Sequence, residues 1–70
     1  MPVFYALFMN NREVIIEFQQ QGAFVKVSAM DVATLTEISI SGPATASEAV
    51  LKRNALKRLD YVLKKKGINR

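Results

Sequence analysis

The 70-residue chain contains no cysteine, no histidine and no tryptophan. Without cysteine it has no disulfide and no thiol nucleophile, and without histidine it lacks the most common general base and metal ligand. The sequence shows no catalytic constellation, no cofactor-binding motif and no cluster of metal ligands. We therefore predict that the protein is not an enzyme, carries no cofactor or metal, and has no small-molecule substrate. The lack of cysteine also fits a reducing compartment.

Long apolar runs are missing as well. The run from Val3 to Met9 has seven residues, far short of the about 20 residues of a membrane-spanning helix. No basic residue precedes it and no cleavage site of small residues follows it, so the sequence does not predict a signal peptide. We expect a cytoplasmic protein without a membrane partner. Met9 offers an alternative start of translation, which would leave residues 1–8 outside the native protein.

The composition is that of a globular protein, because 50% of the residues are apolar and 23% are charged. The chain is predicted to form a single domain over residues 1–70. A core of this size is marginal on its own, and neither disulfides nor a metal can reinforce it. Oligomerisation is the remaining common way to bury more apolar surface.

The clearest predicted element is an amphipathic helix over residues 45–66. Thr45 is the expected N-cap, because Glu48 follows it at the spacing of a capping box. Gly67 is expected to end the helix in the left-handed conformation. The helix presents one apolar stripe, which we expect to cover a sheet. This stripe consists of Leu51, Ala55, Leu56, Leu59, Val62 and Leu63.

Strands are predicted upstream of the helix. Alternating apolar and polar residues indicate a β-meander over residues 12–41. Residues 1–11 form an apolar extension, whose run of β-branched and aromatic residues favours a further strand. The fold class is therefore α+β: a three- or four-stranded antiparallel β-meander with one C-terminal amphipathic helix packed on one face.

The meander's first hairpin has a predictable register. A connection of two residues, Gln21 and Gly22, or of four residues would pair Phe18 with Val25, and it would place Glu17 opposite Lys26 on the other face. Apolar pairs on one face and an opposite-charge pair on the other agree on this register. The next turn begins at Asp31, whose side chain can accept a hydrogen bond from the backbone ahead.

The extension adds a second hairpin, because Asn10 and Asn11 both tolerate positive φ and predict a tight turn. This turn pairs Leu7 with Val14 and leaves large apolar side chains on the sheet face that the helix does not cover. Such a face is more apolar than that of most soluble monomers. We therefore predict self-association as a homodimer or larger oligomer. The predicted interface residues are Phe4, Ala6, Phe8, Ile15, Phe24 and Met30, together with Val50 and Tyr61 on the far side of the helix.

Positive charge is concentrated in the helix. The chain has a net charge of +4, and residues 46–66 hold seven basic and two acidic residues. A nucleic acid is the alternative partner, because such a segment can contact phosphates. The predicted contacts are Arg53, Lys57, Arg58, Lys64 and Lys65. A simpler explanation is that cations stabilise the C-terminal end of a helix dipole.

The chain also resembles a small family of uncharacterised bacterial proteins. The similarity rests on the strings EVIIEF (13–18), VKVSAMD (25–31), TEISISGP (36–43) and ALKRLDYVLKKK (55–66), and it covers roughly residues 12–66. Leu35 stands where such proteins tend to have a glycine. The resemblance implies a strand-strand-strand-helix fold and brings no site residue with it. The function inferred is a small non-enzymatic module that associates with itself. The alternatives are nucleic-acid binding through the helix and an adaptor that binds another protein through the exposed sheet face.

Overall fold

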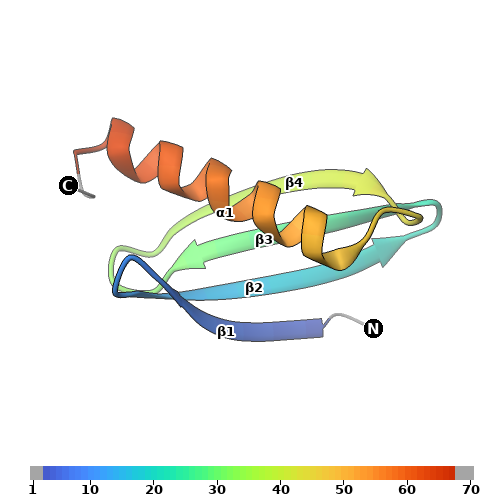
Figure 1. Cartoon of the computed structure of the whole chain (residues 1–70), viewed down its shortest axis with the longest axis horizontal. Coiled ribbons are helices and arrows are strands. Elements are labelled where there is room, and N and C mark those ends of the chain that lie inside the picture. The colour runs from blue at the N-terminus through green and yellow to red at the C-terminus, as the bar shows by residue number, and fades with distance from the viewer. Residues whose placement is uncertain (1–2, 68–70) are drawn as a thin grey trace.

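The fold is one antiparallel sheet with a single helix lying across it, as Figure 1 shows for the computed structural model, which describes residues 3–67. The sheet has four strands in the order β1-β2-β3-β4. The strands are β1 (Val3–Met9), β2 (Arg12–Gln21), β3 (Phe24–Asp31) and β4 (Thr36–Pro43), and they are followed by the helix α1 (Glu48–Lys65). The predicted α+β class is confirmed, with four strands in the meander.

The turn between β1 and β2 is the one that the sequence predicts. Asn10 and Asn11 have φ values of 54° and 64°, the left-handed values that a tight hairpin turn requires at both central positions. Leu7 lies opposite Val14, as expected. Because side chains alternate along a strand, this register places Phe4, Ala6 and Phe8 on the sheet face away from the helix.

The register predicted between β2 and β3 is wrong by two residues. Phe18 lies opposite Val27 rather than Val25, and Glu17 lies opposite Ser28 rather than Lys26. The reason is Gly22, which has a φ of 63° and occupies the first position of the turn instead of the second. A shift of two residues keeps every side chain on its predicted face, so the division between core and outer face survives the error.

The loop between β3 and β4 is built on Asp31, which is fully buried. As predicted, its carboxylate accepts from the backbone ahead: Oδ2 lies 3.1 Å from the Thr34 nitrogen and 2.7 Å from the Thr34 hydroxyl. Its other oxygen forms an ion pair with Arg12 Nε at 3.4 Å. Leu35 completes the loop with a φ of 59°. This left-handed conformation is one that glycine adopts without strain.

The helix starts two residues later than predicted. Ser47, rather than Thr45, is the N-cap, because its side chain accepts from the Val50 nitrogen at 3.1 Å. Glu48 is then the first helical residue and is not part of a capping box. The end is as expected: Gly67 has a φ of 73°, and its nitrogen donates to the Lys64 carbonyl at 3.0 Å.

The core lies between the helix and the inner face of the sheet, and it includes four of the six residues of the predicted stripe, whereas Leu56 and Val62 are only half-buried. From the helix, Leu51, Ala55, Leu59 and Leu63 are buried. The helix packs on β3 and β4. Gly42 in β4 allows this close approach, because a Cβ atom there would lie 2.5 Å from Leu51 Cδ2.

Candidate interaction surface

The strand β1 forms one edge of the sheet and lies apart from the helix (Figure 1). A helix is about 10–12 Å wide and strands are about 4.8 Å apart, so a single helix covers about two strands. Here its backbone lies closest to β3 and β4, and the inner side chains Val14 and Ile16 of β2 are also fully buried in the core. Consequently the inner side chains of β1 are only partly covered, and Val3 and Tyr5 remain 46% and 41% exposed. The width of a single helix accounts for this exposure.

Two side-chain hydrogen bonds join the β1–β2 hairpin to the helix. The Tyr5 hydroxyl donates to Glu48 Oε1 at 3.2 Å, and Asn10 Nδ2 donates to Asp60 Oδ1 at 3.4 Å. The bond to Glu48, together with the negative charge of this carboxylate, raises the pKa of Tyr5 above its ordinary value of 10.0. The Tyr5 ring also packs edge-on against Phe18, with 5.7 Å between the ring centroids. These contacts hold β1 in place while leaving its outer edge open.

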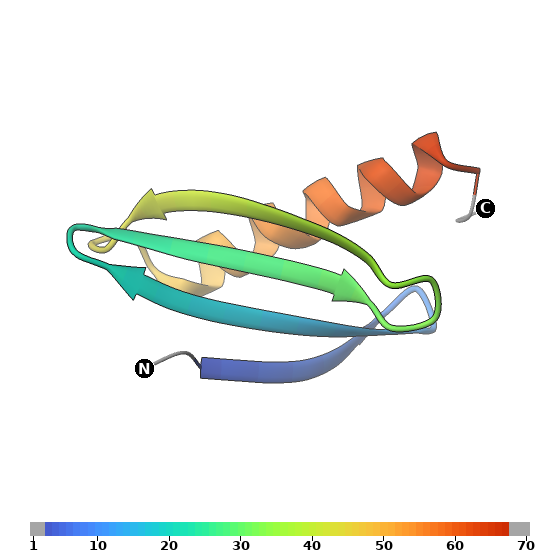
Figure 2. The same ribbon diagram turned by 180° about the vertical axis from the view of Figure 1, so that it is seen from behind.

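None of the described helices or strands lies on the sheet face away from the helix (Figure 2). Toward the β1 edge this outer face carries an apolar patch. Ala6, Ile15 and Met30 lie side by side across three strands. Phe4 and Phe8 flank Ala6 on β1 and are 61% and 77% exposed. We call these five residues the outer apolar patch; it contains most of the interface residues predicted on the sheet.

The predicted interface residue Phe24 lies on the same face but away from this patch. Phe24 pairs with Gln21 on one side and with Pro43 on the other. It lies six residues from Met30 along β3, which corresponds to about 20 Å. Its ring is 62% exposed. The structure therefore places Phe24 at the opposite end of the face, where it is not continuous with the outer apolar patch.

The helix residues of the predicted interface occupy a third location. Val50 and Tyr61 are 39% and 53% exposed on the helix surface that faces away from the sheet. The guanidinium of Arg58 lies 5.5 Å, and Lys65 Nζ 5.8 Å, from the centroid of the Tyr61 ring. These distances allow cation–π attraction. Tyr61 thus has two basic neighbours on its own helix.

The basic residues predicted to contact nucleic acid are all exposed on the helix. Arg58 and Lys65 lie beside Tyr61, whereas Lys64 Nζ forms an ion pair with Asp60 at 3.1 Å. Arg53 and Lys57 lie on the other flank. The helix thus presents one exposed aromatic ring among cations, on the side of the molecule opposite the outer apolar patch.

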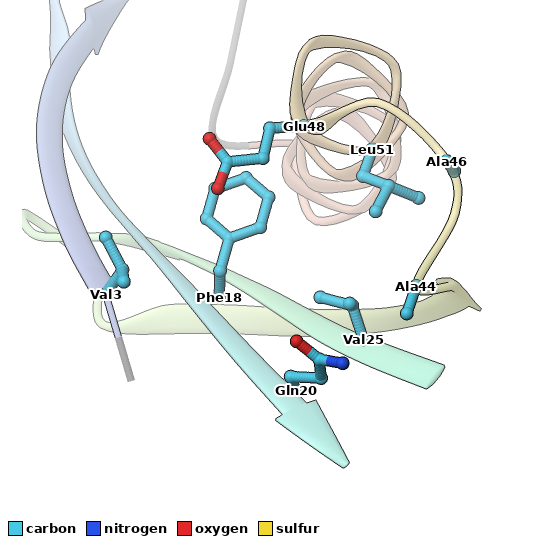
Figure 3. A pocket seen from close by; sticks show the side chains of 8 residues that line it. All are labelled: Val3, Phe18, Gln20, Val25, Ala44, Ala46, Glu48 and Leu51. Carbon is cyan, nitrogen blue, oxygen red and sulfur yellow. The ribbon is translucent and has the colours of Figure 1, made fainter. Parts of the chain in front are cut away.

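Two small cavities lie where the start of the helix leaves the sheet. One, of about 200 Å³, is lined by Val3, Phe18 and Leu51, with Glu48 and Gln20 as polar groups (Figure 3). The other, of about 240 Å³, lies beside it around Tyr5 and also contacts Glu48. Both are smaller than the about 300–1,000 Å³ that ligand pockets usually enclose. We interpret both as incomplete packing between β1 and the start of the helix, and not as ligand-binding sites.

Residues 3–67 contain no group of three or more metal-ligating side chains. Within the same part of the chain, no helix is long and apolar enough to cross a membrane. These findings leave the outer apolar patch and the basic helix as the two surfaces with a distinct character.

Comparison with known protein families gives a match that covers most of the chain. The model of the domain of unknown function DUF6898 matches residues 11–66, which are β2, β3, β4 and α1. The chain belongs to this family. In this DUF6898 protein, β1 lies outside the matched region and occupies the edge of β2 that a three-stranded unit would leave open. Searches of curated proteins and of solved structures gave no match.

Proposed function

We propose that this DUF6898 protein is a small, non-enzymatic cytoplasmic module that associates with a second copy of itself through β1 and the outer apolar patch. The supporting observation is the exposure of an uncharged edge strand, on which Phe4 and Phe8 are 61% and 77% exposed. Edge strands are normally protected by charges, proline, a bulge or a covering element. The strand β1 contains no charged residue, no proline and no glycine.

The size of the core supports the same proposal. The chain has 70 residues, and domains of about this size bury a modest fraction of their surface. Small domains usually gain the missing stability from disulfides, a metal or association. With no cysteine and no histidine in the sequence, association is the route that this chain has available. The lack of cysteine also agrees with a reducing cytoplasm.

The test is a pair of matched double variants, measured by light scattering after size exclusion. Phe4→Glu with Phe8→Glu places two negative charges on β1, and the protein should become monomeric while its circular dichroism spectrum is retained. Val50→Glu with Tyr61→Glu adds the same charges to exposed apolar positions on the helix and should leave association unchanged. If instead the helix variant alone dissociates the protein, the interface is on the helix and the proposal fails.

Nucleic-acid binding through the helix is a second candidate, favoured by Tyr61 between Arg58 and Lys65. Cations beside an exposed ring suit phosphates and bases. Binding of this kind weakens steeply as salt is raised, so a titration of the chain with single-stranded nucleic acid at several salt concentrations tests it.

A third candidate is an adaptor, in which the outer apolar patch binds a different protein. It would appear as a chain that stays monomeric alone.

A further inference from the structure

The backbone of β1 has a defined set of free hydrogen-bonding groups. In an antiparallel strand, each residue directs its N–H and C=O to the same side, and the side alternates from residue to residue. The Val32 nitrogen donates to the Glu13 carbonyl at 3.0 Å, so the polar groups of Glu13 point toward β3. Its partner in β1 is Phe8, and the backbone groups of Phe8 therefore point away from β2, to the open edge.

The alternation extends this assignment along the strand. Phe4 and Ala6 lie an even number of residues from Phe8, so their N–H and C=O groups also point to the open edge. Tyr5 and Leu7 direct theirs to β2. The edge thus offers three evenly spaced residues that can each donate and accept one backbone hydrogen bond, with Ala6 at the centre of the seven residues Val3–Met9.

An antiparallel copy of β1 fits this edge best with a two-fold axis at Ala6. Ala6 then faces Ala6 of the partner, and Phe4 faces Phe8 of the partner on each side. All three residues form hydrogen-bonded pairs and the overlap uses the whole strand. An axis at Tyr5 or Leu7 would reduce the overlap to five residues.

The side chains agree with the same register. Residues directly opposite in an antiparallel pair lie on the same face. The outer face therefore gains two Phe4–Phe8 pairs around the two small Ala6 side chains, where two large side chains would crowd one another. On the inner face, Tyr5 lies opposite Leu7 of the partner. Because β1 carries no charge, two copies meet without repulsion.

The geometry points to edge-to-edge pairing of β1 with β1 of a second copy, in antiparallel register about Ala6. The result is a continuous eight-stranded sheet in which both helices lie on one face and both outer apolar patches merge on the other. This inference rests on the proposed self-association and specifies its geometry. The alternative geometry is stacking of the two outer faces, with the edges left open.

The expected affinity is moderate. A fully buried aromatic side chain removes about 150–250 Å² from water. The rings at this edge, Phe4, Phe8 and Tyr5, are 61%, 77% and 41% exposed, so the rings of two copies together can bury at most about 900 Å² more. This area is below the about 1,200 Å² under which complexes are typically weak. Association should be measured at micromolar concentrations and above.

Disulfide trapping tests the register, because the chain has no cysteine and an introduced thiol is the only one. In the proposed pair the two position-6 Cα atoms are about 5.5 Å apart, within the about 4.4–6.8 Å that a disulfide spans. Ala6→Cys should therefore form a covalent dimer under mild oxidation. Phe4→Cys alone should not, because its two copies lie about 14 Å apart along the strands. Phe4→Cys mixed with Phe8→Cys should again cross-link.

The outcomes separate the two claims. Cross-linking of Ala6→Cys and of the mixture, but not of Phe4→Cys alone, supports the edge pairing. If the native chain dimerises by sedimentation but Phe4→Cys cross-links with itself and Ala6→Cys does not, the register is overturned and the proposed self-association stands. If the native chain remains monomeric at high micromolar concentration, the proposed function itself is overturned. Circular dichroism of each variant checks that it is folded.

Discussion

Tyr5 is the residue that joins the open edge of the sheet to the helix. Its ring packs against Phe18, and its hydroxyl donates to Glu48 in the first helical turn. Only the neutral phenol can donate this hydrogen bond, and ionisation would place two negative charges side by side. The folded state therefore raises the pKa of Tyr5 above 10.0. The resulting contribution to stability is present below the unfolded pKa and is lost as the pH rises through the folded pKa.

This contact predicts the titration of one residue. In a Tyr61→Phe background Tyr5 is the only tyrosine, and the ultraviolet absorbance of tyrosinate then follows its ionisation. Replacing Glu48→Gln removes the negative charge, so we expect the midpoint to move down toward 10.0. An identical midpoint in the two proteins would show that Glu48 does not set the Tyr5 pKa.

At the scale of elements, the start of the helix depends on Ser47. Its side chain accepts from the Val50 nitrogen at 3.1 Å, which satisfies one of the free N–H groups of the first turn. Thr45 lies in the preceding turn, where the Ala46 nitrogen donates to the Pro43 carbonyl at 3.0 Å. The two hydroxyl residues are thus two positions apart but have different roles.

Alanine variants of these residues separate the two candidate caps. Ser47→Ala should lower the free energy of unfolding by about 1 kcal/mol, because an N-cap side chain contributes roughly 0.5–2 kcal/mol. Thr45→Ala, which changes a hydroxyl of similar exposure, should have a much smaller effect. Urea denaturation of both variants at one fixed protein concentration measures the difference. A larger loss for Thr45→Ala would mean that the capping box of the sequence prediction is correct after all.

The elements also show how far the sequence could predict the fold. The β1–β2 hairpin was predictable because both turn residues, Asn10 and Asn11, suit positive φ, so local chemistry sets the register. The β2–β3 hairpin was not, because one glycine can occupy either turn position, and the placement of Gly22 depends on the pairing of whole strands. The apolar stripe of the helix could be predicted from the helical period of its apolar residues. The N-cap could not, because Thr45 and Ser47 both carry a hydroxyl that can cap a helix.

The candidate site was predictable only in part. Alternation along β1 places Phe4 and Phe8 on the outer face, as the structure confirms. The separation of Phe24 from the patch required the true register of β3. The approach of β4 to the helix at Gly42 is a tertiary contact, and no local pattern indicates it.

At the scale of the whole molecule, the fold leaves one side of the sheet open. The helix backbone lies closest to β3 and β4, and β1 at the edge meets the helix through the hydrogen bond from Tyr5 to Glu48. The matched family region begins at residue 11, and β1, which carries the exposed rings of Phe4 and Phe8, lies outside it. We propose that β1 allows two copies of the chain to associate.

Sedimentation equilibrium of the native chain over a range of concentrations tests this claim most directly. We expect an average mass that rises with concentration from 7.8 kDa toward twice that value, with a midpoint in the micromolar range. The Phe4→Glu, Phe8→Glu variant should stay at the mass of one chain throughout. A native chain that remains at 7.8 kDa up to high micromolar concentration would contradict the account.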